Sequence, residues 1–196
     1  MNKVRQLIIT PVILLSLTAC NNNLRSEYLS TVTTSTETTS IDAVEAGNDI
    51  STDITLTSFV EALNNSLPGK IKSTGFNISA PQYEKTTNNG DVYSLSINNN
   101  IDITFTTNGA NNKLTGVMVS EHLSASDTDR VLFLTIMTCT TKVLSPSIDS
   151  DEFDELTIKA PIDTAAGGTF EKNINGINYM FATINGTGRI FVANFN

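Results

Sequence analysis

The chain contains no tryptophan, one histidine and two cysteines among its 196 residues. Two cysteines cannot form a disulfide framework, and a single histidine excludes most zinc sites, which need several histidine or cysteine ligands. Positive charge is also scarce, because 12 lysines and arginines stand against 20 aspartates and glutamates, and the formal net charge is -8. A nucleic-acid-binding face requires clustered lysine and arginine, so this composition argues against a nucleic-acid partner.

The main apolar run lies near the start of the chain, where residues 7–17 read LIITPVILLSL after Lys3 and Arg5. A run of about ten residues is too short to cross a bilayer core of about 30 Å as a helix. A positive start, a short apolar run and a small residue before the cleavage point are typical of a secretory signal peptide. We therefore predict that residues 1–19 are a cleaved signal peptide.

The end of this run, Leu17-Thr18-Ala19-Cys20, resembles the lipobox of bacterial lipoproteins. The resemblance implies cleavage before Cys20 and acylation of its sulfur and amine by chains such as palmitate, which anchor a protein without spanning the membrane. Asn21 stands where the enterobacterial inner-membrane retention signal has aspartate, so the resemblance implies the outer membrane of the cell envelope, with the domain facing the periplasm or the cell surface. The alternative is an ordinary cleaved signal followed by a chance cysteine.

Residues 20–56 form a segment rich in serine, threonine and asparagine. Its apolar residues are too sparse to offset the entropy lost on ordering, so we predict a flexible linker after the acylated cysteine. An exposed threonine-rich strand around residues 31–34 is the alternative. Loss of Lys3 and Arg5 with the signal peptide changes the net charge from -8 to -10, and anionic headgroups should repel a domain of this charge.

Residues 57–196 are expected to form an α+β domain, with helices packed on an antiparallel meander sheet. Ser58 and Glu61 match a capping box that opens a helix ending at Leu67, and Ser126 can cap a second, largely apolar helix that ends at Leu144. The β-branched content of the second helix leaves a strand as its alternative. Residues 151–159 suggest a third, short helix. Alternating apolar residues between asparagine and glycine turns predict strands at about 74–84, 91–98, 100–107, 113–120, 168–174, 177–184 and 188–195.

A possible internal repeat relates two of the predicted hairpins. Ile101, Phe105, Asn108-Gly109 and Lys113-Leu114 have counterparts, in the same order, in Ile177, Phe181, Asn185-Gly186 and Arg189-Ile190. A true repeat would give two tandem helix-plus-sheet units, whereas matches this short also arise by chance among Asn-Gly hairpins.

The candidate catalytic side chains lack the partners that chemistry requires. His122 ends a predicted strand beside Glu121, but the chain has no G-x-S-x-G nucleophile turn, so we interpret His122 as a surface residue. Cys139 lies within an apolar helix, where a buried, unreactive thiol is expected. We therefore predict no catalytic residue and no cofactor.

Acidic residues cluster at the start of the third predicted helix. Asp149, Asp151 and Asp154 are weak candidates for a metal site, because Phe153 stands where the third ligand of a calcium loop belongs. An acidic first helical turn accounts for the same residues. An acidic docking face for a basic partner is a further possibility.

These observations favour a lipid-anchored, non-enzymatic protein-interaction module of the inhibitor, immunity or exclusion type, with a protein partner of unknown identity. The alternatives are a structural accessory of an envelope assembly, a small-ligand-binding lipoprotein, and a hydrolase that uses His122.

Overall fold

The computed structural model describes residues 54–195. The predicted signal peptide, Cys20 and nearly all of the predicted linker lie outside these residues, so they stay predictions. The linker was predicted to extend to residue 56, but Thr55 already forms a β-bridge with Lys113 and Leu56 begins the first described helix.

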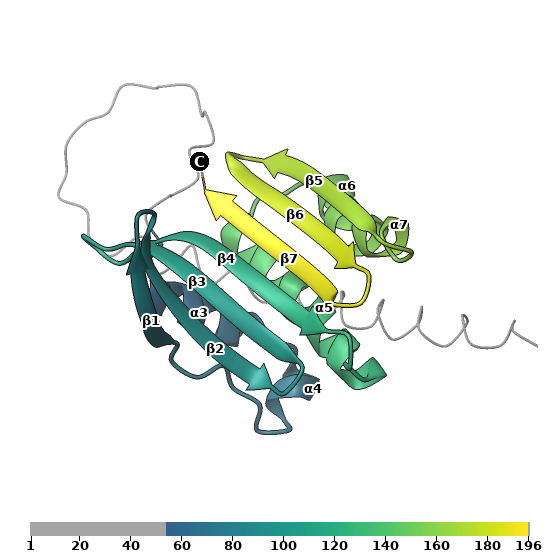
Figure 1. The fold of residues 1–196 in the computed structure, drawn as a ribbon, viewed down its shortest axis with the longest axis horizontal. Helices are drawn as coiled ribbons and strands as arrows, with labels where there is room; N and C mark the ends of the chain where they lie inside the picture. Colours follow the sequence, from purple (N-terminus) through teal and green to yellow (C-terminus); the bar gives the residue numbers. More distant parts are fainter. Residues whose placement is uncertain (1–53, 196) are drawn as a thin grey trace, which may run out of the picture.

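Seven strands form one antiparallel sheet in the order β1-β2-β3-β4-β7-β6-β5 (Figure 1). The first meander joins the second through the β4–β7 pair at the middle of the sheet. The predicted α+β fold is confirmed. The strands span β1 Gln82–Thr87, β2 Gly90–Asn98, β3 Ile101–Asn108, β4 Lys113–His122, β5 Gly168–Ile174, β6 Ile177–Ile184 and β7 Gly188–Phe195.

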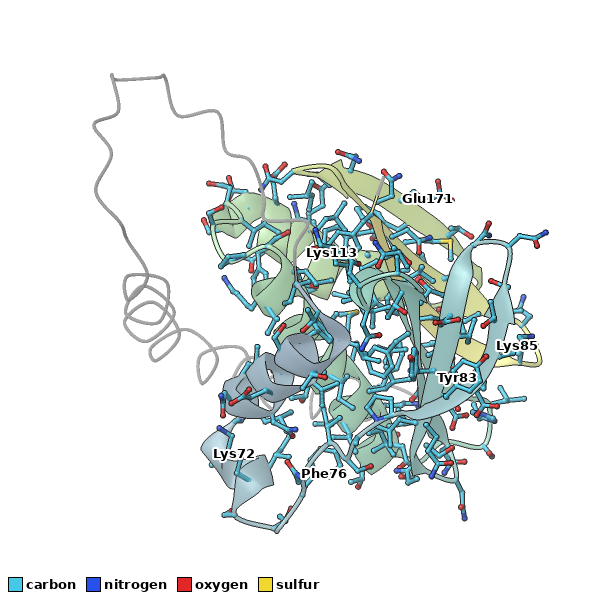
Figure 2. The ribbon with its side chains drawn as sticks, turned by 90° about the vertical axis from the view of Figure 1, so that its left-hand side faces the viewer. Lys72, Phe76, Tyr83, Lys85, Lys113 and Glu171 are labelled. Atoms are coloured by element: carbon cyan, nitrogen blue, oxygen red, sulfur yellow. The ribbon has the colours of Figure 1, made fainter. Side chains whose placement is uncertain are left out.

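All described helices lie on one side of the sheet, and Figure 2 shows the two layers edge-on. The longest helix, α5, and the first described helix, α3, pack against each other and against β4. The helical segments are α3 Leu56–Ser66, α4 Gly69–Lys72, α5 Asp127–Leu144, α6 Ser150–Asp154, the π-helical turn η2 Glu155–Lys159, and α7 Ala160–Asp163.

The core fills the space between the helices and the facing side of the sheet. Alternate β3 residues point into it, and the Phe59 and Phe105 rings meet edge to face with centroids 6.1 Å apart. Phe133 of α5 meets Phe181 of β6 in the same way, at 6.0 Å. Each such buried side chain contributes about 1.5–3 kcal/mol through removal from water, so this layer fixes which side of the sheet the helices cover.

The start of α5 is tied to the turn between β2 and β3. Ser126 caps the helix by accepting from the Asp129 backbone N–H, and its own backbone N–H donates back to Asp129. The Asp129 carboxylate also accepts from the side chains of Asn98 at 2.8 Å and Asn100 at 3.0 Å. The predicted cap at Ser126 and the predicted end at Leu144 are confirmed.

The predicted cap of the first helix and the predicted bounds of the first strand were wrong. Thr55, rather than Ser58, caps α3, and Ser58 occupies the third helical position where the prediction placed Glu61. The first strand was predicted at 74–84 but spans Gln82–Thr87, and all six of its residues are exposed. An edge strand without a buried face has no apolar alternation, so the sequence contains no signal for its position.

The third predicted helix is longer than residues 151–159. It runs from α6 through the π-helical turn into α7 and includes Pro161. The π-helical turn ends at Lys159, two residues before Pro161, whose missing N–H cannot donate within a regular helical turn. Phe153 and Leu156 are buried, as expected of its inner face.

The two hairpins of the possible repeat occupy matching places, since β3–β4 and β6–β7 meet at the centre of the sheet. Phe105 and Phe181 both point into the core and are fully buried. The correspondence ends after the two turns. A bulge after Thr106 places Leu114 on the core side of the sheet, whereas its counterpart Ile190 lies on the opposite side. The two hairpins therefore correspond in position up to their turns, and the correspondence does not extend along β4 and β7.

Candidate functional site

The side of the sheet opposite the helices is here called the open face, because no described element covers it (Figure 2). Strand register assigns its residues, since side chains alternate between the two sides and paired residues share a side. One row crosses the sheet from Thr104 through Met118, Val192 and Met180 to Glu171. The next row places Ile190 of β7 between Ser120 and Ala182.

The centre of the open face is apolar. Met118, Met180, Ile190 and Val192 are half-buried and adjoin the buried Ala182 on β4, β6 and β7. These five residues are called the apolar patch below. A continuous apolar patch on a sheet that lacks a covering layer is typical of an interaction surface.

The residues around the apolar patch are polar, and most of the charged ones are acidic. Asp102 lies on the β3 side and Glu171 on the β5 side, while Glu84 accepts a hydrogen bond from the Ser94 hydroxyl near the β1 edge. Lys85 pairs in register with Val92, which places it on the same face. The described part of the chain as a whole has nine lysines and arginines against fourteen aspartates and glutamates, a net charge of -5.

His122 lies at the border of the open face and contacts an acid. Its Nε2 is 2.8 Å from Asp102 Oδ2, and the Ser96 hydroxyl donates to the other carboxylate oxygen at 2.5 Å. Asp102 therefore lies between the serine and the histidine, whereas a serine hydrolase needs the histidine in the middle. Ser120 is closer to His122 in sequence, but its hydroxyl contacts the Asp102 backbone carbonyl, at 3.5 Å. This order of contacts supports the interpretation of His122 as a surface residue.

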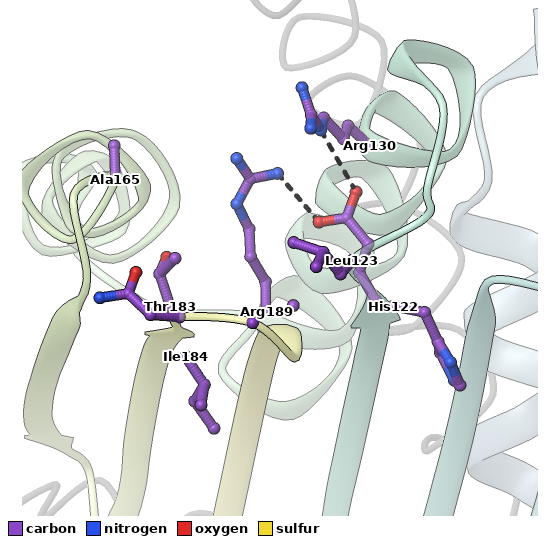
Figure 3. Close-up of a pocket in the computed structure, with 11 residues that line it drawn as sticks. His122, Leu123, Arg130, Ala165, Thr183, Ile184 and Arg189 are labelled. Carbon is purple, nitrogen blue, oxygen red and sulfur yellow. Dashed lines mark hydrogen bonds and ion pairs between the residues drawn. The ribbon is translucent and has the colours of Figure 1, made fainter.

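A separate pocket of about 210 Å³ lies at the end of the sheet where β4 stops and β7 begins (Figure 3). Glu121, only 3% exposed, stands between two arginines. Arg189 Nη1 donates to Glu121 Oε2 at 2.9 Å, and Arg130 Nε lies 3.9 Å from Oε1. Burial raises the pKa of Glu121, and the two arginines oppose that shift. The lining residues are Glu121, His122, Leu123, Arg130, Ala165, Thr183, Ile184, Asn185, Gly186, Gly188 and Arg189.

Gly188 allows the strands to approach closely beside this pocket. Its φ is +137°, and a Cβ at this position would lie 1.8 Å from the Glu121 backbone carbonyl oxygen. Any larger residue would push β7 away from β4. The glycine thus helps to set Glu121 and Arg189 directly opposite each other in the ladder.

The acidic cluster is built into the start of α6. Asp149 caps the helix by accepting from the Asp151 backbone N–H at 2.8 Å. Lys172 of β5 makes ion pairs with Glu155 and with Glu152. Among residues 54–195 no group of three potential ligands is arranged to hold a metal ion, and the cap accounts for the position of Asp149.

Cys139 is fully buried in α5, and its Sγ donates to the Ser66 carbonyl oxygen at 3.4 Å. The sequence therefore located the thiol and the histidine correctly, but it gave no indication of the paired arginines. A glutamate at a core-facing strand position was the available signal for the pocket, since a buried carboxylate requires a charged partner.

No family model, no curated protein and no solved structure matches this chain. None of the helices between residues 54 and 195 combines the length and apolar character needed to cross a membrane.

Proposed function

We propose that this chain is a lipid-anchored protein of the bacterial outer membrane whose folded domain is a non-enzymatic protein-interaction module of the inhibitor, immunity or exclusion type. The apolar patch on the open face is the observation that carries the proposal. The lipobox supports the anchor, with acylation at Cys20.

The surface favours a folded protein partner with an apolar projection surrounded by basic side chains. Met118 and Met180 give the patch two flexible, polarizable side chains that can adapt to a convex partner. Asp102, Glu171 and Glu84 around the patch would face lysines and arginines of the partner. Such charge complementarity speeds association and weakens as salt screens it.

A photo-crosslinking experiment tests this assignment. A benzoylphenylalanine in place of Val192, in the full-length chain in living cells, should give one dominant crosslink to a basic protein. Adding Met180→Lys should reduce that crosslink at least tenfold, because it places a cation where an apolar, basic surface is expected to dock.

Tyr83→Lys is the matched control. Tyr83 is 57% exposed on β1 and pairs with Tyr93 on the helix side of the sheet, so the same change of charge occurs off the open face. The control should leave the crosslink unchanged. Crosslinks only to a second copy, or to the chain's own N-terminal segment, would overturn the proposal.

The salt dependence of partner binding distinguishes an inhibitor-type module from a structural accessory of an envelope assembly. Recovery of the partner should fall as sodium chloride rises from about 0.05 to 0.5 M, since the screening length shortens over this range. A partner that remains bound at high salt would contradict the electrostatic, inhibitor-type role and favour a structural accessory of an envelope assembly.

A further inference from the structure

The pocket beside Glu121 holds more hydrogen-bond donors than the described residues use. Arg189 is 24% exposed, and its one hydrogen bond within residues 54–195, from Nη1 to Glu121, leaves the remaining guanidinium N–H groups without an acceptor in that range. Arginine presents five donors in a planar fork that matches a carboxylate. A half-buried guanidinium with free donors at a pocket wall is suited to bind an anion.

Arg130 adds a second positive charge at the pocket mouth. Its side chain is 45% exposed and lies near both Glu121 and Asp127. Among the residues that line the pocket, these two arginines face one carboxylate, Glu121, while Asp127 pairs with Arg130 from outside the lining at 3.3 Å. In Figure 3 the His122 side chain points away from the two arginines. Its Nε2 contacts Asp102 Oδ2 instead.

The pocket also has an apolar border. Leu123, which is 64% exposed, lines this pocket. Ile184 also borders it, but its side chain points away from the two arginines, to the other side of the sheet (Figure 3). Leu123 lies next to Arg189 in Figure 3. An apolar side chain beside arginine donors is the pattern expected where a ligand has one charged end and one apolar end.

The size of the pocket limits what can enter. Its volume of about 210 Å³ is below the range of about 300–1,000 Å³ that is typical of sites for cofactors and drug-sized molecules. We propose that the pocket binds a carboxylate on a small apolar body, about the size of one amino-acid residue, with the carboxylate on Arg189 and Arg130 and the apolar part on Leu123. This proposal does not depend on the apolar patch or on the proposed function.

Titration of the full-length chain in detergent with N-acetyl-leucine tests the site, with N-acetyl-leucinamide as the neutral probe. The acid should bind saturably and shift the methyl resonances of Leu123, whereas the amide should bind at least tenfold more weakly. Equal binding of acid and amide, or no saturable binding of the acid, would overturn the proposal.

Three variants test the roles of the charges. Arg189→Gln should weaken binding of the acid at least tenfold. Arg130→Gln, at a position where 45% of the side chain is exposed, should weaken it several-fold. Glu121→Gln should strengthen it several-fold, because a competing negative charge disappears while the shape is kept. Lys72→Gln, on the distant helix α4, is the matched control and should change nothing. Weaker binding to Glu121→Gln would contradict the proposal.

A second pair of probes distinguishes the possible sources of the carboxylate. A pentapeptide ending in a free leucine carboxylate is compared with the same peptide carrying an internal glutamate and an amidated end. Tighter binding of the first peptide than of N-acetyl-leucine would identify a chain terminus, and tighter binding of the second would identify an acidic side chain. Binding no tighter than that of N-acetyl-leucine would identify a free small molecule.

Discussion

Glu121 and Arg189 lie opposite each other in the β4–β7 ladder, and Arg189 Nη1 donates to Glu121 Oε2 at 2.9 Å. This ion pair lies where the two meanders join, at core-facing positions that apolar side chains usually occupy. A buried ion pair often contributes little net stability, because removal of both charges from water offsets their attraction. Burial raises the pKa of Glu121 and the Arg189 guanidinium lowers it, so Arg189 offsets part of the cost of burying this charge.

The charge on Glu121 should make stability depend on pH. Burial raises the pKa of this carboxyl above its ordinary value of 4.5, so the folded chain binds its proton more readily than the unfolded chain. Acidification from neutral pH toward about 4.5 therefore favours the folded state at this residue. We expect the gain in unfolding free energy from Glu121→Gln to be largest near pH 7.5 and to shrink toward pH 4.5 in urea titrations.

The comparison isolates Glu121, because other carboxyls act in the opposite direction in both proteins. Hydrogen bonds from Ser126 lower the pKa of Asp129, and Lys172 lowers that of Glu155, so these residues lose stabilising contacts as the pH falls. Their contributions cancel in the difference between variant and native chain. A difference that stays constant over this pH range would refute the assignment.

A second buried polar contact joins the end of α5 to the sheet. The Ser145 hydroxyl is 2.8 Å from the Tyr179 hydroxyl, both residues are buried, and burial raises the pKa of Tyr179. Tyr179→Phe should cost about 1–3 kcal/mol, because Ser145 is left without this partner in the core. The double variant Tyr179→Phe with Ser145→Ala should cost less than the sum of the two single changes. Chemical unfolding of the four proteins measures this coupling, and strict additivity would show that the contact contributes nothing.

The cap of α5 provides a prediction about helix stability. Ser126→Ala removes a side chain that accepts from the Asp129 N–H at 3.2 Å and donates to its carboxylate at 2.8 Å. We expect a loss of about 1 kcal/mol in unfolding free energy. Thr128→Ala, an exposed change in the same first turn, should leave stability unchanged or slightly raised, since alanine is the better helix former. Equal effects of the two substitutions would refute the role of the cap.

The sequence predicted those features of the fold that depend on local chemistry. Ser126 located the start of α5, and the turns at Asn175-Gly176 and around Gly186 located the last three strands at their observed bounds. Strand β1 was misplaced because its exposed residues carry no period. Arg130 and Arg189 are brought to Glu121 only by the pairing of β4 with β7 and the packing of α5, which are long-range contacts that no local sequence pattern contains.

The contacts of Asp102 show that local sequence patterns also could not predict the environment of His122. Glu121, His122 and several serines are close in sequence, which leaves a hydrolase open as an interpretation. Only the sheet register places Asp102 between Ser96 and His122, and so separates the histidine from a nucleophile. The pairing of strands therefore determines which group His122 contacts.

The anchor can be tested independently of the fold. If the lipobox at Leu17-Thr18-Ala19-Cys20 is used, Cys20→Ser should abolish incorporation of an alkyne-labelled palmitate and release the protein from the outer-membrane fraction. Cys139→Ser is the matched control, because Cys139 is fully buried in α5 and cannot be acylated without unfolding. It should retain both label and membrane association. Several acyl chains bind far more tightly than one, since each buried methylene contributes about 0.8 kcal/mol, so loss of Cys20 should leave little residual binding. A Cys20→Ser protein that remains in the outer-membrane fraction would show that another contact holds the chain there.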